Sequence, residues 1–410
     1  MPTARPSAHS TTTQLAGGIA AIALIVAALG FTACAAIGGA GSGTGEAANA
    51  PAAEAPADTH PRASFVAVGD NLPDDAIGAY ADAQAGTVGD GAYDYARIYE
   101  PVKPAIEAAD LAYVKQETHL GGDDIGPKGY PSFNTTDAMA DAIVSTGFDM
   151  VASASNHAYD WGAFGANEHS RSVWNGKPVV YTGTATSEEE AAQISTVERN
   201  GITFSLLDYT YGVNGYSKDD LPPYAVNFID KERIATDVAR AREASDVVLV
   251  AMHWGTENLT EVDDMQREYA QYLADLGVDV VLGSHPHVIG PMAWVDGKDG
   301  HRTLVAYSLG NFLSNHEAPG AENELEGMLS CDFVRNDDNS VSIENVAWTP
   351  LVNHTNAARD TFAVYPAKDY TADLAAEHPV FSQMDDPLAW VRDTTAEIVG
   401  REGGEFEIKG

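Results

Sequence analysis

Two kinds of residue are scarce in this sequence of 410 residues: cysteine and the basic residues. The two cysteines, Cys34 and Cys331, are too few for a disulfide framework or for an all-cysteine zinc site. Lys and Arg number 23 against 60 Asp and Glu, which gives a formal net charge of −37. Because Lys and Arg bind the phosphates of nucleic acids and of anionic lipids, this charge argues against nucleic acid as a partner and against a basic lipid-binding patch. The hydrophobic fraction of 44% allows a large packed core.

The N-terminal part has a composition that is not typical of a folded domain. Residues 15–33 carry no charged side chain, and Cys34 follows them. The letters FTAC that end at Cys34 resemble a bacterial lipoprotein cleavage box, although Phe31 stands where Leu is usual. Residues 35–62 are almost entirely Ala, Gly, Ser, Pro and Glu, which predicts a disordered linker. Three outcomes stay open for residues 1–34: lipidation of Cys34, a cleaved secretory signal peptide, or an uncleaved membrane anchor. Each of them places the rest of the chain outside the cytoplasm.

From about residue 63 the sequence alternates apolar runs with longer amphipathic stretches. The apolar runs that predict strands lie at residues 64–68, 111–114, 150–154, 202–207, 247–252, 278–282 and 304–307. The amphipathic stretches that predict helices lie at residues 136–146, 231–244 and 263–276. Because several runs are continuously apolar rather than alternating, they are typical of strands that are buried on both faces. The pattern predicts an α/β fold.

Polar side chains follow several predicted strands at the point where each strand ends. They are Asp70, Glu117, Asn156, His157, His253, His285, His287 and Asn311. In an open α/β sheet the carboxyl ends of the strands line a common crevice where ligands bind. Taken singly, such an Asp or Asn is usually a turn or helix cap, and such a histidine is usually a satisfied buried side chain. Packing does not explain four imidazoles at matching strand ends, and together with the carboxylates they predict a divalent metal site.

The other histidines and the second cysteine receive no such role. Six histidines lie outside the strand-end pattern and are expected to be solvated: His9, His60, His169, His301, His316 and His354. The sequence offers no ligand partner for His119 or His378. Cys331 lies in an apolar run and is expected to be an inert buried thiol.

Seven sequence blocks follow one another along the chain: VGDNL, ADLAYVKQETHLGG, GYPSFNTT, GFDMVASASNHAYDWG, VAMHWG, GVDVVLGSHPHVIG and VAYSLGNFL. In this order they resemble the blocks of the CapA family of bacterial poly-γ-glutamate capsule-biosynthesis proteins, which are related to calcineurin-like metallophosphoesterases. The resemblance implies a metallophosphoesterase-like four-layer α/β/β/α sandwich in a single large domain. That domain is expected at residues 63–355, with residues 356–410 as a C-terminal extension packed on it. The resemblance also implies one or two divalent ions at one edge, with Mn, Zn or Fe as candidates.

By the same resemblance, most strand-end residues receive a role. The metal ligands would be Asp70 and His287 for the first metal, Asn156, His253 and His285 for the second, and the bridging Glu117 for both. His157 would act on the leaving group as general acid. Asp160, three residues later, would orient that imidazole.

Two residues depart from the phosphoesterase pattern. Leu72 stands where that pattern has a histidine, so the first metal would have a thinner ligand shell, and a single-metal site stays open. Lys115 stands two residues before Glu117, where the family usually has Asn. Its ammonium group would either bind a phosphate or compete with a cation. Lys115 and Asn311 are expected to bind substrate.

Three functions remain open. The first is a metal-dependent hydrolase of phosphate esters or related anhydrides, in which His157 protonates the departing oxygen. The second is an accessory subunit of a capsule-synthesis complex, held at the membrane by the N-terminus, that binds an anionic polymer without turnover. The third is a binding module that has lost an ion. The presence of His157 favours the first, whereas Leu72 and Lys115 favour the third.

Overall fold

The computed structural model describes residues 60–316, 320–404 and 406–410. The predicted signal or anchor at residues 1–34, including Cys34, and nearly all of the predicted linker lie outside these residues. Among the described residues, no helix combines the length and the apolar character that a bilayer-spanning segment needs.

The helices and strands are distributed along the whole described chain. The α-helices are α1 (Asp75–Ala85), α2 (Ala96–Tyr99), α3 (Lys103–Glu107), α4 (Ala138–Thr146), α5 (Ser170–Trp174), α6 (Glu188–Ala191), α7 (Lys231–Ala244), α8 (Asp264–Asp275), α9 (Ala372–Glu377) and α10 (Pro387–Val399). The strands are β1 (Arg62–Asn71), β2 (Leu111–Gln116), β3 (Met150–Ala152), β4 (Val180–Thr182), β5 (Thr196–Arg199), β6 (Ile202–Thr210), β7 (Val247–His253), β8 (Val280–Ser284), β9 (Met292–Asp296), β10 (Arg302–Ala306), β11 (Asn311–Leu313), β12 (Leu325–Arg335), β13 (Val341–Thr355), β14 (Phe362–Pro366) and β15 (Glu407–Ile408).

These strands form two sheets. The first has the order β14-β13-β12-β1-β2-β3-β4, with β11 also beside β1 and β15 beside β13. Its strands β1 to β4 are parallel, whereas the pairs β1–β12, β12–β13 and β13–β14 are antiparallel. Strand β15 is parallel to β13. The second sheet has the order β5-β6-β7-β8-β10-β9, with β6, β7, β8 and β10 parallel. Parallel strands in both sheets bring several carboxyl ends to the same edge.

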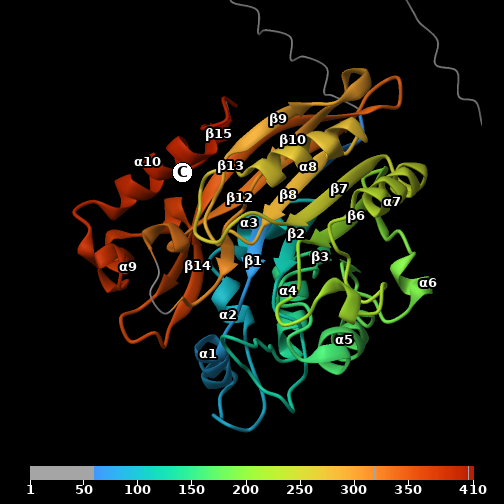
Figure 1. Cartoon of the computed structure of the whole chain (residues 1–410). Helices are drawn as coiled ribbons and strands as arrows, with labels where there is room; N and C mark the ends of the chain where they lie inside the picture. Colours follow the sequence, from blue (N-terminus) through green and yellow to red (C-terminus); the bar gives the residue numbers. More distant parts are fainter. Residues whose placement is uncertain (1–59, 317–319, 405) are drawn as a thin grey trace, which may run out of the picture. The chain divides into compact units, whose positions relative to one another are not determined.

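The two sheets pack face to face, and helices cover their outer faces (Figure 1). Between the sheets, the ring of Phe333 lies 5.8 Å from that of Phe65 and 5.1 Å from that of Phe204. Helices α1 to α5 bury residues such as Ile143 on the outer face of the first sheet, and α7 and α8 bury residues such as Leu273 on that of the second. The predicted four-layer α/β/β/α fold is therefore confirmed.

The three helices predicted from the sequence are all present, and α7 has the predicted ends. The antiparallel strands β12, β13 and β14 were not predicted. The sequence gives a weak signal for β13 because Glu344, Asn345 and other exposed or half-exposed residues interrupt its first half. Residues 356–410 contribute β14, α9, α10 and β15, and Phe381 and Ile398 join the core between the sheets.

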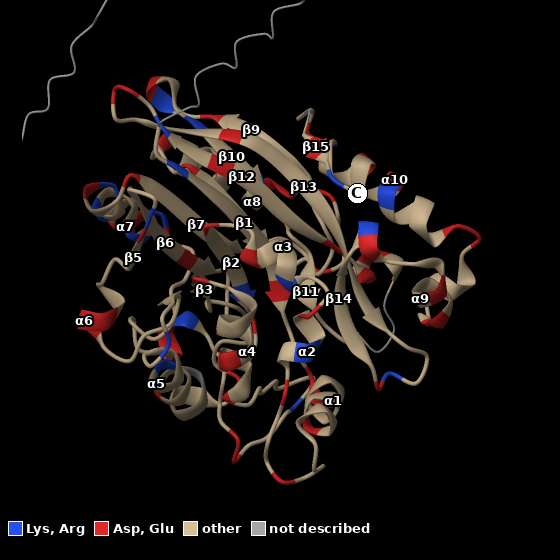
Figure 2. Ribbon diagram, turned by 180° about the vertical axis from the view of Figure 1, so that it is seen from behind, with Lys and Arg blue, Asp and Glu red and all other residues tan. Residues whose placement is uncertain are grey.

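Charged side chains are spread over the whole domain. Figure 2 shows Asp and Glu in red on helices and loops on all sides, with fewer Lys and Arg in blue between them. A few red and blue positions lie within the sheets.

Candidate metal centre

Strand ends from both sheets meet at one edge of the sandwich, as the sequence pattern predicts. Asp70 lies near the end of β1, and the neighbouring strand β2 is followed by Glu117, whose backbone N–H donates to Asn71 O at 3.1 Å. The first residue of β11, Asn311, lies opposite Asp70 in the β1–β11 pair. In the second sheet, β7 ends at His253. The first sheet thus supplies the carboxylates, and the second supplies imidazoles.

The turn after β8 holds His285 and His287 in an unusual backbone conformation. Their φ angles are 94° and 58°, in the left-handed region that is strained for residues with a side chain. The backbone N–H of His285 donates to Asp70 Oδ2 at 2.9 Å, which ties this turn of the second sheet to the first sheet. A Cβ atom at Gly69 would lie 1.9 Å from Gly310 O. Glycine at this position therefore allows β1 to approach the segment before β11.

Glu117 lies at the centre of the cluster. Its side chain is fully buried, and neither carboxylate oxygen has a hydrogen-bond partner among the described residues. Oε1 lies 3.7 Å from His253 Nε2, and Oε2 lies 4.0 Å from His287 Nδ1. Asn156 Oδ1 lies 2.9 Å from the same His253 nitrogen, and Asn311 Oδ1 lies 2.9 Å from the same His287 nitrogen. Each oxygen of Glu117 therefore faces one histidine–asparagine pair.

Asp70 and His285 add further unpartnered atoms to the cluster. Asp70 Oδ1 and His285 Nδ1 are buried and form no hydrogen bond within the described part of the chain. Asp70 Oδ1 lies 3.9 Å from His253 Nδ1, a nitrogen that also lies 2.9 Å from Ser284 Oγ. Among the described residues there are three sets of three side chains whose donor atoms lie within 4.8 Å of one another. The sets are Glu117, His253 and His285; Asp70, Glu117 and His287; and Glu257, His285 and His287.

Burial shifts pKa values in the cluster in the direction that favours the neutral form: it raises those of the carboxyl groups and lowers that of His285. Burial, and then repulsion from Glu117, raises the pKa of Asp70 to about 8. Burial raises the pKa of Glu117 to about 7, although the charge of His157 opposes the shift. Burial, and then the charge of His287, lowers the pKa of His285 to about 3. The nitrogen and oxygen donors of these groups fit a divalent metal ion.

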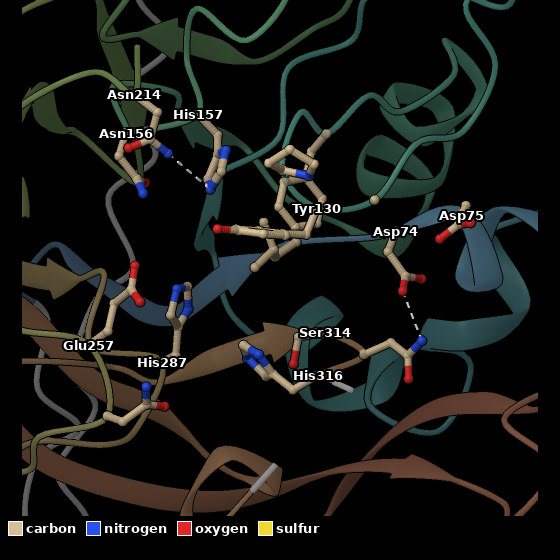
Figure 3. A pocket seen from close by; sticks show the side chains of 16 residues that line it. Asp74, Asp75, Tyr130, Asn156, His157, Asn214, Glu257, His287, Ser314 and His316 are labelled. Atoms are coloured by element: carbon tan, nitrogen blue, oxygen red, sulfur yellow. Dashed lines mark hydrogen bonds between the residues drawn. The ribbon is translucent and has the colours of Figure 1, made fainter. Parts of the chain in front are cut away.

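His157 lies beside the cluster, with its imidazole directed to the neighbouring cavity. Its Nδ1 lies 2.8 Å from Asp160 Oδ2, which also accepts the backbone N–H of Phe133 at 2.7 Å. Its Nε2 lies 3.5 Å from Asn214 Nδ2 (Figure 3). Burial disfavours the charged ring, but the hydrogen bond to Asp160 and the charge of Glu117 outweigh burial and raise the pKa of His157. The structure thus separates His157 from its neighbour Asn156, which faces His253.

A cavity of about 700 Å³ opens in front of the cluster. Asn156, His157 and His287 reach it from the cluster, and Glu257 lies near His287 at its edge (Figure 3). Asp74 and Asp75 add further acidic groups, and Tyr130 and Phe133 add aromatic surface. Among the described residues that line the cavity, none is Lys or Arg. Apart from its histidines, the described wall of the cavity therefore offers an anion no cationic side chain.

The structure places Lys115 behind the cluster, away from the cavity. Its side chain is fully buried, and its ammonium group donates to Asp208 Oδ1 at 2.8 Å and to Ala154 O. Asp208, in β6, also accepts the backbone N–H of Ala154 at 2.6 Å. The expected substrate contact of Lys115 is corrected here, because its ammonium group is engaged with the protein interior. Asn311 is also fully buried and does not line the cavity.

Three residues differ from or extend the sequence-based expectations for the site and for the histidines. Glu257 was not singled out, although it comes four residues after His253. His316, expected to be solvated, lies in the cavity wall, and its Nε2 is 3.1 Å from Asn311 Nδ2. Burial lowers the pKa of His316 to about 4. His354, also expected to be solvated, is buried in β13. His316 follows no predicted strand directly, so the strand-end rule could not find it.

Comparison with known proteins gives a family match and two related proteins. The family described as "Bacterial capsule synthesis protein PGA_cap" matches residues 64–316. The chain is 32% identical over 169 residues to the PGA biosynthesis protein CapA of Bacillus subtilis (strain 168), a match that covers 40% of this chain and 42% of that protein. It is 26% identical over 177 residues to the capsule biosynthesis protein CapA of Bacillus anthracis, covering 42% of this chain and 41% of that protein. The match thus spans less than half of the length of either relative.

Among solved structures, the chain resembles a 5'-nucleotidase precursor from Thermus thermophilus with a TM-score of 0.40 and 14% identity. The alignment covers 82% of this chain and 59% of that chain.

Proposed function

Because the chain belongs to the bacterial capsule synthesis protein family PGA_cap, we propose that it acts in capsule biosynthesis as a metal-dependent hydrolase of phosphate esters or related anhydrides. The observation that carries this proposal is the environment of Glu117. Its two buried oxygens have no hydrogen-bond partner in the described chain, and each faces a histidine–asparagine pair. A buried carboxylate without partners is costly, and a divalent cation is the partner that these donors fit.

The residues around the cavity divide into metal ligands and a proton donor. A bound divalent cation would lower the pKa of a water molecule and neutralise phosphoryl oxygens. Asp70, Glu117, Asn156 and the histidines of β7 and the β8 turn would hold the cation. His157 Nε2 faces the cavity and gives its proton to the departing oxygen, while Asp160 holds Nδ1 and stabilises the charged ring.

The charge of the cavity favours a substrate that carries its anionic group at one end. The lining residues include Asp74, Asp75 and Glu257 but no Lys or Arg within the described segments. A phosphoryl group is attracted only at the metal edge, and a long polyanion is repelled by the rest of the wall. This argument favours a phosphate ester over direct binding of an extended anionic polymer.

A second candidate function is an accessory subunit that binds γ-carboxylates of the capsule polymer without turnover. The observation in its favour is Leu72, which lines the cavity where the phosphoesterase pattern has a histidine. In this function the metal edge holds a carboxylate of the polymer, and capsule-synthesis proteins are the partners. His157 and Asp160 then have no proton to transfer.

The test of the hydrolase is turnover by the full-length protein, purified in detergent and loaded with Mn, Zn or Fe, on a panel of phosphate esters. His157→Ala should lower kcat by about a hundred- to ten-thousand-fold while the metal content is unchanged, because the side chain is a general acid and not a ligand. The matched control is His169→Ala, which removes another imidazole that lies 2.8 Å from a carboxylate, Asp137, but outside the cavity. This control should keep wild-type turnover.

Two outcomes would contradict this proposal. Metal-loaded wild-type protein without turnover on any ester favours the accessory subunit. Loss of metal by His157→Ala contradicts the division between proton donor and ligands.

We also propose that the protein lies outside the cytoplasm, held at the membrane by lipidated Cys34 or by an N-terminal helix. The support is the uncharged run at residues 15–33 and the cysteine that follows it. Fractionation of cells that carry the wild-type protein or Cys34→Ala tests this. Release of the variant alone indicates lipidation, and retention of both indicates the helix. Recovery of both as freely secreted protein contradicts membrane attachment.

A further inference from the structure

We infer that Asn311 is a metal ligand, so that two cations are held in matching histidine–asparagine pairs, one at each oxygen of Glu117. This inference rests on the metal centre of the proposed function and deepens it. It assigns to Asn311 a role other than the substrate contact expected from the sequence. It also identifies the group that takes the place of the histidine that is missing at Leu72.

The first support is the correspondence between the two sides of Glu117. On one side Oε1 faces His253 Nε2 at 3.7 Å, and Asn156 Oδ1 lies 2.9 Å from that nitrogen. On the other side Oε2 faces His287 Nδ1 at 4.0 Å, and Asn311 Oδ1 lies 2.9 Å from that nitrogen. Donor atoms bound to one metal ion at about 2.1 Å are separated by roughly 3–3.5 Å. Both pairs therefore need only a small movement to share a cation.

The second support is the orientation of the Asn311 amide. Its Nδ2 donates to His287 O at 3.3 Å and lies 3.1 Å from His316 Nε2. The reversed amide would place its carbonyl oxygen against the His287 carbonyl, where two acceptors would face each other. The hydrogen bonds thus fix Oδ1 on the side of the His287 imidazole. His316 is a positioning residue for this amide.

The third support is the place of Asn311 in the fold. It lies opposite Asp70 in the parallel pairing of β11 with β1, and its side chain is fully buried. Asp70 Oδ1 is itself buried without a partner among the residues described. Asp70, Glu117 and His287 supply three donor atoms close together, and Asn311 Oδ1 supplies a fourth. Four donors are the usual number for a zinc ion in a protein.

Two other roles fit Asn311 and this side of the cluster less well. A substrate contact requires access to the cavity, which Asn311 does not line. Glu257 has a carboxylate oxygen within 4.8 Å of donor atoms of His285 and His287, so it is the rival fourth ligand. Its side chain is exposed, however, and ligation would draw it from water into the cluster.

The metal stoichiometry of the full-length protein tests the inference. Metal-free protein in detergent is titrated with Mn²⁺, and bound manganese is counted by calorimetry and by elemental analysis. The wild-type protein should bind about two ions, and Asn311→Ala and Asn156→Ala about one each, because each variant removes a ligand from one position. Asn311→Asp should keep about two, because it retains an oxygen donor.

Asn353→Ala is the matched control, because Asn353 is another buried asparagine whose amide donates to Ser314 O at 2.8 Å, away from the cluster. It should keep the wild-type stoichiometry. Glu257→Gln should also keep it, and loss of an ion from this variant alone would assign the fourth ligand to Glu257 and overturn the inference.

A cysteine substitution distinguishes a ligand from a residue that only orients His287. Asn311→Cys and Asn156→Cys loaded with Co²⁺ should each show a sulfur-to-cobalt charge-transfer band, because a thiolate that contacts the ion binds it. The wild-type protein and Asn353→Cys should show none. A band in Asn156→Cys but not in folded Asn311→Cys would overturn the inference and leave the proposed function intact. Wild-type protein that binds no manganese would instead overturn the metal centre of the proposed function.

Discussion

Glu117 and Asp208 are both fully buried carboxylates, but the protein supplies partners to only one of them. Asp208 accepts hydrogen bonds from the ammonium group of Lys115 at 2.8 Å and from the backbone N–H of Ala154 at 2.6 Å. Glu117 accepts none from the described chain and faces imidazole nitrogens instead. A buried charge that the chain itself pairs has a structural role, whereas one surrounded by metal-binding donors is arranged for a cation.

A third carboxylate shows that lack of partners is not sufficient to identify such a site. Both oxygens of Glu326 are buried and unpartnered among the described residues. Burial, and then repulsion from Glu324 and Asp70, raises the pKa of Glu326 well above its usual value. None of the metal-binding groups found in the described chain includes it. The nitrogen donors around Glu117 are therefore what distinguish it from Glu326.

The largest effect is expected from breaking the structural pair. Lys115→Met leaves Asp208 buried without its cation, which should lower the free energy of unfolding by about 3–5 kcal/mol. Chemical denaturation measures this loss. The double variant Lys115→Met with Asp208→Asn should recover most of the stability, because no uncompensated charge remains. A single variant that loses less than about 1 kcal/mol would show that the pair is not structurally important.

Metal removal should have the next largest effect, and it should act through Glu117. A chelator should lower the free energy of unfolding of the wild-type protein by about 2.7 kcal/mol if the free metal had been at a hundred times its Kd. Glu117→Gln should be insensitive to the chelator because it no longer holds the cation. Asp208→Asn should stay sensitive, and thermal unfolding with and without chelator measures the difference. Equal sensitivity of Glu117→Gln and the wild-type protein contradicts the assignment.

The pH dependence of stability should change sign with metal. In metal-free protein the pKa values of Asp70 and Glu117 are raised to about 8 and about 7. Above about pH 4, the folded state keeps protons on these two carboxyl groups that the unfolded state releases. The stability that the two groups contribute is therefore fully present below about pH 4, and it is lost as the pH rises through their folded-state pKa values. The slope is at most about 1.4 kcal/mol per pH unit for each group. With Mn²⁺ the ligands must be deprotonated, so stability should rise with pH instead. Urea unfolding between pH 5 and 8 checks this, and equal slopes would contradict it.

The smallest effect is expected at the third carboxylate. Glu326→Gln replaces a carboxyl group whose pKa is raised by burial with an amide of similar shape, and it should change the free energy of unfolding by less than about 1.5 kcal/mol. Its manganese content should equal that of the wild-type protein, whereas Glu117→Gln should lose its metal. Loss of metal from Glu326→Gln, measured by elemental analysis, would show that Glu326 belongs to the metal centre.

Much of the site could be predicted because the strand-end rule depends on local sequence. Asp70, Glu117 and His253 each follow an apolar run, and parallel neighbours bring such ends together. Lys115 also lies near the end of an apolar run, so the same rule places it at the site. In the structure its ammonium group instead donates to Asp208. Its partner Asp208 lies 93 residues later, inside strand β6, and nothing in the local pattern links the two.

The unpredicted parts depend on contacts that are distant in sequence or on polar strands. The role of Asn311 depends on the pairing of β11 with β1, and β11 has only three residues. His316 acquires its position from the same strand, which ends three residues before it. The two sheets and the helices of the parallel part follow from continuous apolar runs, whereas β13 contains several polar residues and gives no such signal.

The tie between His285 and Asp70 has a consequence for the order in which the protein matures. The groups around Glu117 come from chain segments between Asp70 and Asn311, which span almost the whole family-matched region, residues 64–316. The complete centre therefore cannot form until this region has been synthesised and the two sheets have packed together. A nascent chain that lacks β11 carries the other donors of the centre but not Asn311. A complete ligand set would therefore form late, and the concentration of metal where folding is completed would determine which ion the centre first receives.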